Sequence, residues 1–275
     1  MENLLSKLEN TKQYLLNIIE EKPTIGLILG SGLGTLADEI ENPIIIDYKD
    51  IPNFPVSTVE GHAGQLVIGK LMGKQVIAMK GRFHYYEGYP MQEVTFPVRV
   101  MKAIGVELLL VTNACGGLNP ELYPGALMII NDHINMTGNN PLIGPNYPEL
   151  GPRFPDMSSA YDKELIKFVH KVGKKIDINT HEGVYVSISG PTYSSKAESK
   201  MFQIMGADTI GMSTVPEVIV AKHSGMKVIG ISCVTDMAIL EGSHSISHEE
   251  VMEVANRTRP KFIKLVKEVI KEVTF

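Results

Sequence analysis

The stretch from Ile25 to Gly34 constrains the fold more than any other part of the chain. It begins with the apolar run Ile25-Gly26-Leu27-Ile28-Leu29 and ends in Gly30-Ser31-Gly32-Leu33-Gly34. A short apolar run favours a buried strand, and glycines directly after it allow positive φ and close approach of backbone N–H groups to a ligand. If the chain turns helical from Thr35 to Ile40, the positive end of the helix faces the same place. The pattern is typical of an anion-binding loop, with Ser31 as an extra donor, or of a tight structural turn.

Neither of the best-known phosphate motifs is present. The dinucleotide fingerprint G-x-G-x-x-G fails because Thr35 stands where the third glycine is due. The run from Gly64 to Lys70 has the spacing G-x-x-x-x-G-K, but Leu71 occupies the position of the magnesium-binding Ser or Thr. The loop alone therefore does not identify a ligand.

Composition excludes several classes of protein. A length of 275 residues with 44% hydrophobic content is enough for one large α/β domain or two small ones, and a net charge of -5 gives no reason to expect nucleic acid as a partner. No apolar stretch approaches the roughly 18 residues that span a bilayer, and the run from Met1 to Thr11 is too charged for a signal peptide. Cys115 and Cys233 lie in apolar runs, which favours free buried thiols. We expect a cytoplasmic globular protein without a membrane partner.

Periodicity predicts alternating strands and helices along the whole chain. Residues 65–71 and 75–80 are predicted to form a hairpin, and capping pairs open helices at Ser195 with Glu198, Thr214 with Glu217 and Ser247 with Glu250. No repeat or linker interrupts the pattern, so we predict a single domain over residues 1–275 with about nine strands. Strands are expected at 25–29, 44–46, 65–71, 75–80, 108–112, 127–130, 183–189, 207–211 and 227–234, and helices at 2–21, 91–105 and 162–172.

Polar side chains gather where several of these strands end. The run Gly81-Arg82-Phe83-His84-Tyr85-Tyr86-Glu87-Gly88 follows one strand, and alternation would place Arg82, His84 and Tyr86 on one face. The run Thr112-Asn113-Ala114-Cys115-Gly116-Gly117 is a second junction between a strand and glycines, where ligands sit in open α/β sheets. Residues 133–155 lack an apolar period, and irregular segments of this length are usually functional or lie between subunits. Taken singly, each residue is also compatible with a structural role.

Six motifs, in order along nearly the whole chain, resemble the trimeric purine nucleoside phosphorylases. They are Gly30-Ser31-Gly32, Gly61-His62-Ala63-Gly64, Gly81 to Gly88, Thr112 to Gly117, Gly190-Pro191-Thr192-Tyr193 and Gly211-Met212-Ser213-Thr214-Val215-Pro216-Glu217. The resemblance implies an α/β fold in which a mixed, partly barrel-like central β-sheet is flanked by helices. It also implies a homotrimer with active sites near subunit interfaces. The implied reaction cleaves the N-glycosidic bond of purine (2′-deoxy)ribonucleosides with inorganic phosphate, giving free base and (deoxy)ribose 1-phosphate, without a cofactor or metal.

The resemblance also assigns roles to positions in this sequence. His84, Asp236 and Arg82 are the implied catalytic residues. The phosphate is expected to contact Ser31, His62, Arg82, His84, Ser213 and the backbone N–H of Ala114. The ribose is expected to contact Tyr86, Met212, His248 and, from the neighbouring subunit, Phe154. The base is expected to contact Tyr193, Ser194, Ile210, Thr235 and Asp236.

Two positions depart from the members of the family that act on inosine and guanosine. Those enzymes carry a glutamate where this chain has Ser194 and an asparagine where it has Asp236. An ionised Asp236 only accepts hydrogen bonds, which suits a 6-amino group and repels O6 of hypoxanthine. A protonated Asp236, with a raised pKa, could instead donate to N7 as a general acid. We therefore expect a shift towards adenosine.

Three other functions are weighed against this one. Methylthioadenosine phosphorylases are close relatives, but they usually place a small apolar residue where this chain has His248. A non-catalytic nucleoside-binding or scaffold protein would not need Ser31, Arg82 and His84, because nucleoside binding alone requires no phosphate site. A nucleoside hydrolase would show an acidic calcium-binding cluster, which the sequence lacks, and would form product without phosphate.

Overall fold

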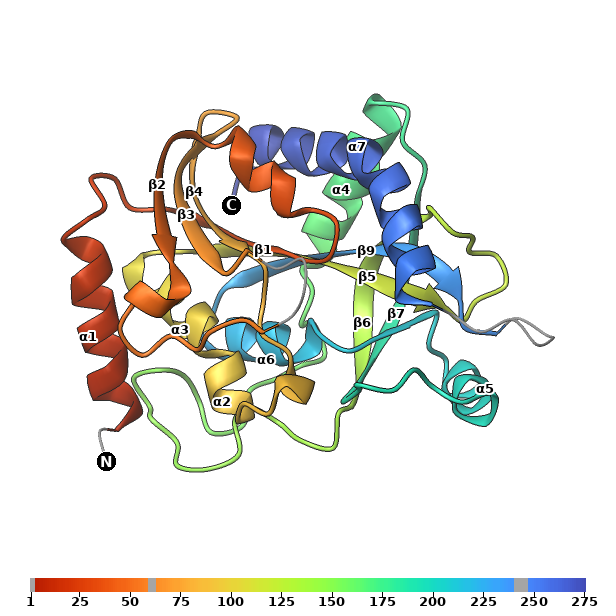
Figure 1. Ribbon diagram of the computed structural model, residues 1–275, viewed down its shortest axis with the longest axis horizontal. Helices are drawn as coiled ribbons and strands as arrows, with labels where there is room; N and C mark the ends of the chain where they lie inside the picture. The colour runs from red at the N-terminus through yellow and green to blue at the C-terminus, as the bar shows by residue number, and fades with distance from the viewer. Residues whose placement is uncertain (1–2, 59–62, 240–246) are drawn as a thin grey trace.

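The protein folds around one mixed β-sheet, as seen in a computed structural model that describes residues 3–58, 63–239 and 247–275 (Figure 1). Within these ranges nine strands follow the order β2-β3-β4-β1-β5-β8-β7-β6-β9. The strands are β1 (Ile25–Leu29), β2 (Glu41–Asp47), β3 (Gln65–Leu71), β4 (Lys74–Lys80), β5 (Leu108–Gly117), β6 (Leu127–Met136), β7 (Thr180–Ile188), β8 (Thr209–Gly211) and β9 (Lys227–Met237).

The sheet is partly ring-like, because β9 pairs with β5 as well as with β6. The pairings β5–β8, β8–β7, β7–β6, β6–β9 and β9–β5 return to their starting strand, while β1, β4, β3 and β2 extend outward from β5 as an open sheet. Parallel pairs join β5 to β1 and β9, and the antiparallel hairpin of β3 and β4 forms as predicted. The expectation of a mixed, partly barrel-like sheet flanked by helices is confirmed.

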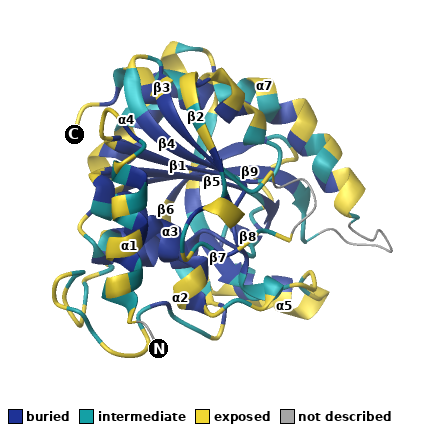
Figure 2. Ribbon diagram, turned by 60° about the vertical axis from the view of Figure 1, so that its left-hand side comes forward, coloured by how far each residue is buried: buried dark blue, intermediate teal, exposed yellow. Residues whose placement is uncertain are grey.

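Helices cover both sides of this sheet (Figure 1). α4 and α7 lie on one side, and α1, α2, α3 and α6 lie on the other, while α5 projects beside the ring. Figure 2 shows that the central strands β1, β5 and β9 are mostly buried, whereas β2 at the edge of the sheet is largely exposed. The helices are α1 (Leu4–Leu16), α2 (Met91–Val94), α3 (Phe96–Ile104), α4 (Lys163–Lys175), α5 (Lys196–Ile204), α6 (Val215–His223) and α7 (His248–Glu272), with short 3₁₀ helices η1 (Gly34–Glu39), η2 (Tyr48–Asp50) and η3 (Tyr85–Glu87).

Local sequence signals account for several helix ends. Ser195 with Glu198 and Ser247 with Glu250 form the predicted capping boxes of α5 and α7, which satisfy N–H groups that a helix start leaves open. Gly105 ends α3 with a φ of +119°, in the left-handed region that favours glycine. Cys115 and Cys233 are free and buried, as predicted. No helix in the described part of the chain is long and apolar enough to cross a membrane.

The segment after the glycine loop is helical, as expected, but forms the 3₁₀ helix η1. Three strand predictions are wrong. The strand expected to end at Thr112 continues as β5 to Gly117. β6 likewise takes in residues 133–136, the start of the segment expected to be irregular. The strand preceding Arg82 ends at Lys80, so Arg82, His84 and Tyr86 do not alternate along a strand.

Candidate active site

One cavity brings together the residues that the sequence placed at separate strand ends. It is bounded by the C-terminal half of β5, the end of β9, the segments that follow β4 and β8, and the first turn of α7. Of the predicted site residues, His62 lies outside the described residues, and Phe154 does not line the cavity. The others all do: Ser31, Arg82, His84, Tyr86, Ala114, Tyr193, Ser194, Ile210, Met212, Ser213, Thr235, Asp236 and His248.

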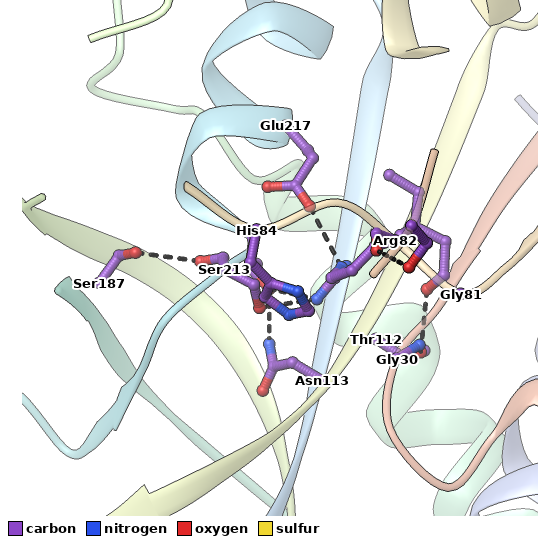
Figure 3. Close-up of polar contacts among 12 residues, drawn as sticks. Gly30, Gly81, Arg82, His84, Thr112, Asn113, Ser187, Ser213 and Glu217 are labelled. Carbon is purple, nitrogen blue, oxygen red and sulfur yellow. Dashed lines mark hydrogen bonds and ion pairs between the residues drawn. The ribbon is translucent and has the colours of Figure 1, made fainter. Parts of the chain in front are cut away.

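Arg82 supplies the positive charge of this cavity and is only 2% exposed. Its Nε lies 3.2 Å from Oε1 of Glu217, and its Nη1 donates to Oγ of Ser213 at 2.7 Å (Figure 3). Nη1 also lies 3.3 Å from Oγ1 of Thr214. A guanidinium held on two sides in this way is fixed in orientation, so its donors keep a constant direction relative to the cavity.

Ser213 is held by a strained turn. Thr214 has φ +74° and ψ -55°, and the N–H of Val215 donates to the carbonyl oxygen of Ser213 at 2.8 Å. These values define a rare γ-turn, a conformation that costs about 1–3 kcal/mol for a β-branched residue. Asn113 Nδ2 and Arg82 Nη1 both donate to the Thr214 hydroxyl, which holds the turn in place. Strain of this kind is found where a site fixes a side chain.

The predicted capping pair of Thr214 and Glu217 is therefore wrong. Thr214 precedes α6 but caps no N–H group, because its hydroxyl is turned towards Arg82 and Asn113. Glu217 is 3% exposed and pairs with Arg82 across the cavity wall. The pattern T-x-x-E correctly predicts the start of a helix, but it does not predict that Thr214 and Glu217 hold Arg82 in place.

His84 is connected through Glu87 to a third segment of the chain. The His84 N–H donates to Oε1 of Glu87 at 2.6 Å, and its Nδ1 lies 3.3 Å from the same oxygen. Oε2 of Glu87 accepts from the N–H and hydroxyl of Thr58, at 2.8 and 2.7 Å. Burial raises the pKa of Glu87, but the hydrogen bonds from His84 and Thr58 outweigh it and lower the pKa to about 2. This carboxylate stays ionised and orients the imidazole.

The glycine loop packs against β5 through its backbone, and Ser31 is its residue in the cavity lining. The Gly30 N–H donates to Oγ1 of Thr112 at 3.1 Å, and that hydroxyl donates to the Ile28 carbonyl at 3.0 Å. A Cβ on Gly30 would lie 2.6 Å from the Thr112 carbonyl oxygen, so only glycine fits here. Since η1 is a short 3₁₀ helix without a side-chain cap, it has little helix dipole to offer an anion. Any anion site at Ser31 depends on side chains from the neighbouring segments.

A β-bulge shapes the opposite end of the cavity. In the pairing of β5 with β9, Cys115 lies opposite Val234 but Gly116 lies opposite Asp236, which leaves Thr235 without a partner. A bulge re-aims side chains, and here both Thr235 and Asp236 line the cavity, although neighbours on a regular strand point to opposite faces. Gly116 leaves room for the carboxylate, since a Cβ there would lie 3.1 Å from Oδ2 of Asp236.

The Asp236 carboxyl is held in a poorly hydrated place. Burial raises its pKa, and the hydrogen bond with Thr235 lowers it by less. Thr235 Oγ1 lies 3.0 Å from Oδ1 of Asp236 and 3.2 Å from the carbonyl oxygen of Cys115. The hydroxyl has one hydrogen, so it donates either to Oδ1 of Asp236 or to the carbonyl oxygen of Cys115. Nearby, the hydroxyls of Ser194 and Ser199 are 2.7 Å apart.

Aromatic residues form the wall between the two ends. Tyr86 stacks on His84 with ring centroids 4.8 Å apart, and burial followed by the charge of Glu87 raises the pKa of its phenol to about 12. Tyr193 remains 46% exposed. Phe154 lies elsewhere on the surface, 88% exposed, with the guanidinium of Arg153 6.0 Å from its ring centroid.

Several residues of this site were not predicted. Asn113 and Glu87 lie within two of the six family motifs. His84 and Glu87 are three residues apart, which is the spacing of a capping box, and this signal indicates that the two side chains interact. Cys115 and Gly116, which lie in the motif from Thr112 to Gly117, also line the cavity. Ile188, Ala238 and Val251 line it as well, but nothing in their local sequence distinguishes them from core residues.

Comparisons with known proteins agree with this geometry. The family model described as "Phosphorylase superfamily" matches residues 24–271. The chain is 58% identical to purine nucleoside phosphorylase 1 of Bacillus subtilis, over 96% of this chain and 97% of the relative, and 45% identical to the purine nucleoside phosphorylase of Bos taurus, over 94% and 92%. The chain belongs to the purine nucleoside phosphorylases. Purine nucleoside phosphorylases are pentosyltransferases, which transfer the pentose of a purine nucleoside to phosphate.

Solved structures of other purine nucleoside phosphorylases have the same fold. Isoform 2 from Schistosoma mansoni, in complex with cytosine and ribose-1-phosphate, matches with a TM-score of 0.94 at 45% identity, covering 98% of this chain and 97% of that one. The purine nucleoside phosphorylase of the same organism in complex with adenosine matches with a TM-score of 0.93 at 41% identity and the same coverage.

Proposed function

We propose that this purine nucleoside phosphorylase acts preferentially on 6-aminopurine nucleosides such as adenosine. The observation that supports the preference is the partly buried carboxyl of Asp236, which lines the same cavity as the hydroxyl of Ser194. A protonated carboxyl offers one donor and one acceptor, which match N7 and the 6-amino group of adenine. The O6 of hypoxanthine would face an acceptor instead. Ser194 offers no carboxylate to receive the N1–H of a 6-oxopurine.

At the other end of the cavity, the phosphate is proposed to bind Arg82, His84, Ser31, Ser213 and the Ala114 N–H, with His62 as a further contact. A fixed guanidinium, an imidazole and several neutral donors can surround a dianion without a metal or cofactor. Glu217 and Glu87 would hold the first two in place rather than touch the phosphate.

Catalysis is proposed to come from positioning and electrostatics. As the C–N bond breaks, the ribose becomes cation-like and the purine gains negative charge. Phosphate held beneath the ring stabilises the ribose, and a proton on Asp236 stabilises the leaving purine at N7. Tyr86, Met212 and His248 also line the cavity, and the ribose is proposed to lie against them.

A homotrimer is proposed as the working form, with Phe154 closing the sugar pocket of a neighbouring subunit. The support is a large aromatic side chain that is 88% exposed on its own subunit and does not line its own cavity. Replacing Phe154 with alanine should raise KM for the nucleoside while leaving the melting temperature unchanged. We also propose a cytoplasmic location, which the two free buried thiols favour.

The decisive experiment compares kcat/KM for adenosine, inosine, guanosine and methylthioadenosine, with and without phosphate. We expect adenosine to be preferred, and we expect Asp236→Asn combined with Ser194→Glu to move the preference towards inosine. A large inosine preference that persists in Asp236→Asn would overturn the base assignment. Product formed equally well without phosphate would overturn phosphorolysis, and methylthioadenosine as the best substrate would favour the alternative phosphorylase.

A further inference from the structure

A second cavity is lined by residues of α1, α2, α3, the end of α6 and the segment that follows β6. We call it the Arg99 cavity. It has a volume of about 320 Å³ and shares no lining residue with the nucleoside cavity. Its apolar wall includes Leu4, Phe96, Leu142, Tyr147 and Leu150, and its charged or titratable residues are Lys7, Glu93, Arg99 and His223.

Arg99 is a buried cation that lacks a carboxylate partner among the described residues. Its side chain belongs to α3, lines the cavity and leaves the residue only 7% exposed. In the described part of the chain, its hydrogen-bonding partner is Nδ1 of His223, 3.5 Å from Nη1. Burial lowers the pKa of Arg99 to about 10, so the group remains charged at neutral pH. A buried charge is costly unless an anion compensates it.

His223 does not provide that compensation. Burial and the neighbouring Arg99 lower the pKa of His223, so it is neutral at neutral pH. A neutral imidazole can accept from one N–H of the guanidinium, but it adds no negative charge. The guanidinium has five N–H groups, and those not directed at His223 are available to a ligand in the cavity.

Hydrogen bonds order the segment after β6 that forms one wall of the cavity. Gln92 Nε2 donates to the carbonyl oxygen of Ile143 at 2.8 Å, which ties the segment after β6 to α2. Further along this segment, Arg153 Nη1 donates to the carbonyl oxygen of Gly144 at 2.8 Å. A ligand would therefore meet a wall that is already ordered, which lowers the entropic cost of binding.

The charges of the lining indicate which anion fits. Arg99 and Lys7 are positive and Glu93 is negative, so the lining has a net charge of one positive unit. This matches a single carboxylate, which a guanidinium can bind through two parallel hydrogen bonds, better than a phosphate dianion. The apolar residues opposite would cover a hydrophobic body. We propose that the Arg99 cavity binds a small monocarboxylate with an apolar or aromatic body.

Calorimetric titration of the intact protein with 4-iodobenzoate tests this site. The neutral isostere 4-iodobenzamide serves as the control ligand. We expect the acid to bind and the amide not to bind. Arg99→Gln should raise the dissociation constant of the acid by roughly tenfold or more, which is the scale of a charged hydrogen bond. Lys102→Gln removes a charge from the same helix outside this cavity and should leave binding unchanged. Equal binding of acid and amide, or equal loss in both variants, would overturn the proposal.

A crystal soak of the unmutated protein and a stability measurement test the site even if Arg99→Gln does not fold. The iodine of 4-iodobenzoate gives an anomalous signal, and the carboxylate should lie within hydrogen-bonding distance of Arg99 in the unmutated protein. In addition, Arg99→Met should leave the melting temperature unchanged or higher, because it removes an uncompensated buried charge. A lower melting temperature together with iodine absent from this cavity would identify Arg99 as a structural residue and refute the site.

Discussion

Arg82 and Glu217 form a buried ion pair at the wall of the nucleoside cavity, with Nε of the arginine 3.2 Å from Oε1 of the glutamate. The two residues come from segments more than a hundred positions apart, one after β4 and one in the first turn of α6. Both are at most 3% exposed, so neither charge can be satisfied by bulk water. The pair therefore fixes the orientation of Arg82, and Glu217 is a positioning residue.

We predict that Glu217→Gln will raise KM for phosphate more than KM for the nucleoside. Removing one charge of a buried pair leaves the other uncompensated, which costs roughly 3–5 kcal/mol of unfolding free energy. The loosened guanidinium should raise KM for phosphate by roughly tenfold, the equivalent of about 1.4 kcal/mol. Steady-state kinetics with each substrate varied in turn measure the difference. Glu253→Gln, an exposed position on α7, is the matched control. An unchanged KM for phosphate in a folded Glu217→Gln enzyme would refute the positioning role.

The Glu87 carboxylate gives a prediction for acid stability. Its pKa is lowered to about 2 in the folded protein, from 4.5 as the ordinary value. The stabilisation from its hydrogen bonds is therefore complete above pH 4.5 and is lost as the pH falls towards 2. In Glu87→Gln this contribution is absent, so the melting temperature should change less with pH between 4.5 and 2 than in the unmutated protein. Differential scanning calorimetry across that range measures it, and parallel curves for the two proteins would contradict the prediction.

The pKa of Asp236 is shifted in the opposite direction to that of Glu87, so its charge should destabilise the folded protein as the pH rises. Its pKa is raised by burial above the ordinary value of 3.8, so the carboxyl is easier to protonate in the folded protein than in the unfolded chain. Below pH 3.8 the side chain is protonated in both folded and unfolded chains and costs nothing, whereas above the raised pKa the folded protein must bury a charge. Asp236→Asn removes that cost. We expect it to raise the melting temperature at pH 7 and to have little effect near pH 3.5, although it should impair adenosine cleavage. A destabilised Asp236→Asn protein at pH 7 would count against this account.

Features that depend on neighbouring residues could be predicted from the sequence. The strands at residues 25–29 and 65–71 match the predicted bounds, because their apolar runs and flanking glycines are local signals. The caps at Ser195 and Ser247 were likewise predicted, since each depends on a glutamate three residues later. The convergence of Arg82, His84 and Tyr86 was predicted for the wrong reason. They line one cavity because the chain leaves β4 and turns through η3, not because they alternate on a strand.

Features that depend on distant partners could not be predicted. The bulge at Thr235 exists only in the pairing of β5 with β9, and it decides that both Thr235 and Asp236 line the cavity. The sequence T-x-x-E at Thr214 matches the spacing of a helix cap. In the structure the Thr214 hydroxyl instead accepts hydrogen bonds from Asn113 and Arg82, and it caps no N–H group of α6. The local sequence predicts where α6 begins. Tertiary contacts give Thr214, the residue before it, a role other than capping.

The hydrogen bonds that the Thr214 hydroxyl accepts give the last prediction. The hydroxyl accepts from Asn113 at 2.9 Å and from Arg82 at 3.3 Å, so Thr214→Val, which keeps the shape, leaves two buried donors short of an acceptor. We expect a loss of about 1–3 kcal/mol in unfolding free energy, with a higher KM for phosphate because Ser213 is no longer held in its turn. Thr214→Ser keeps the acceptor and removes the β-branch that disfavours φ +74°, so it should retain activity and equal or exceed the unmutated protein in stability. Chemical denaturation and phosphate kinetics of the two variants separate these effects. If valine and serine behaved alike, the hydroxyl would not be what holds the turn.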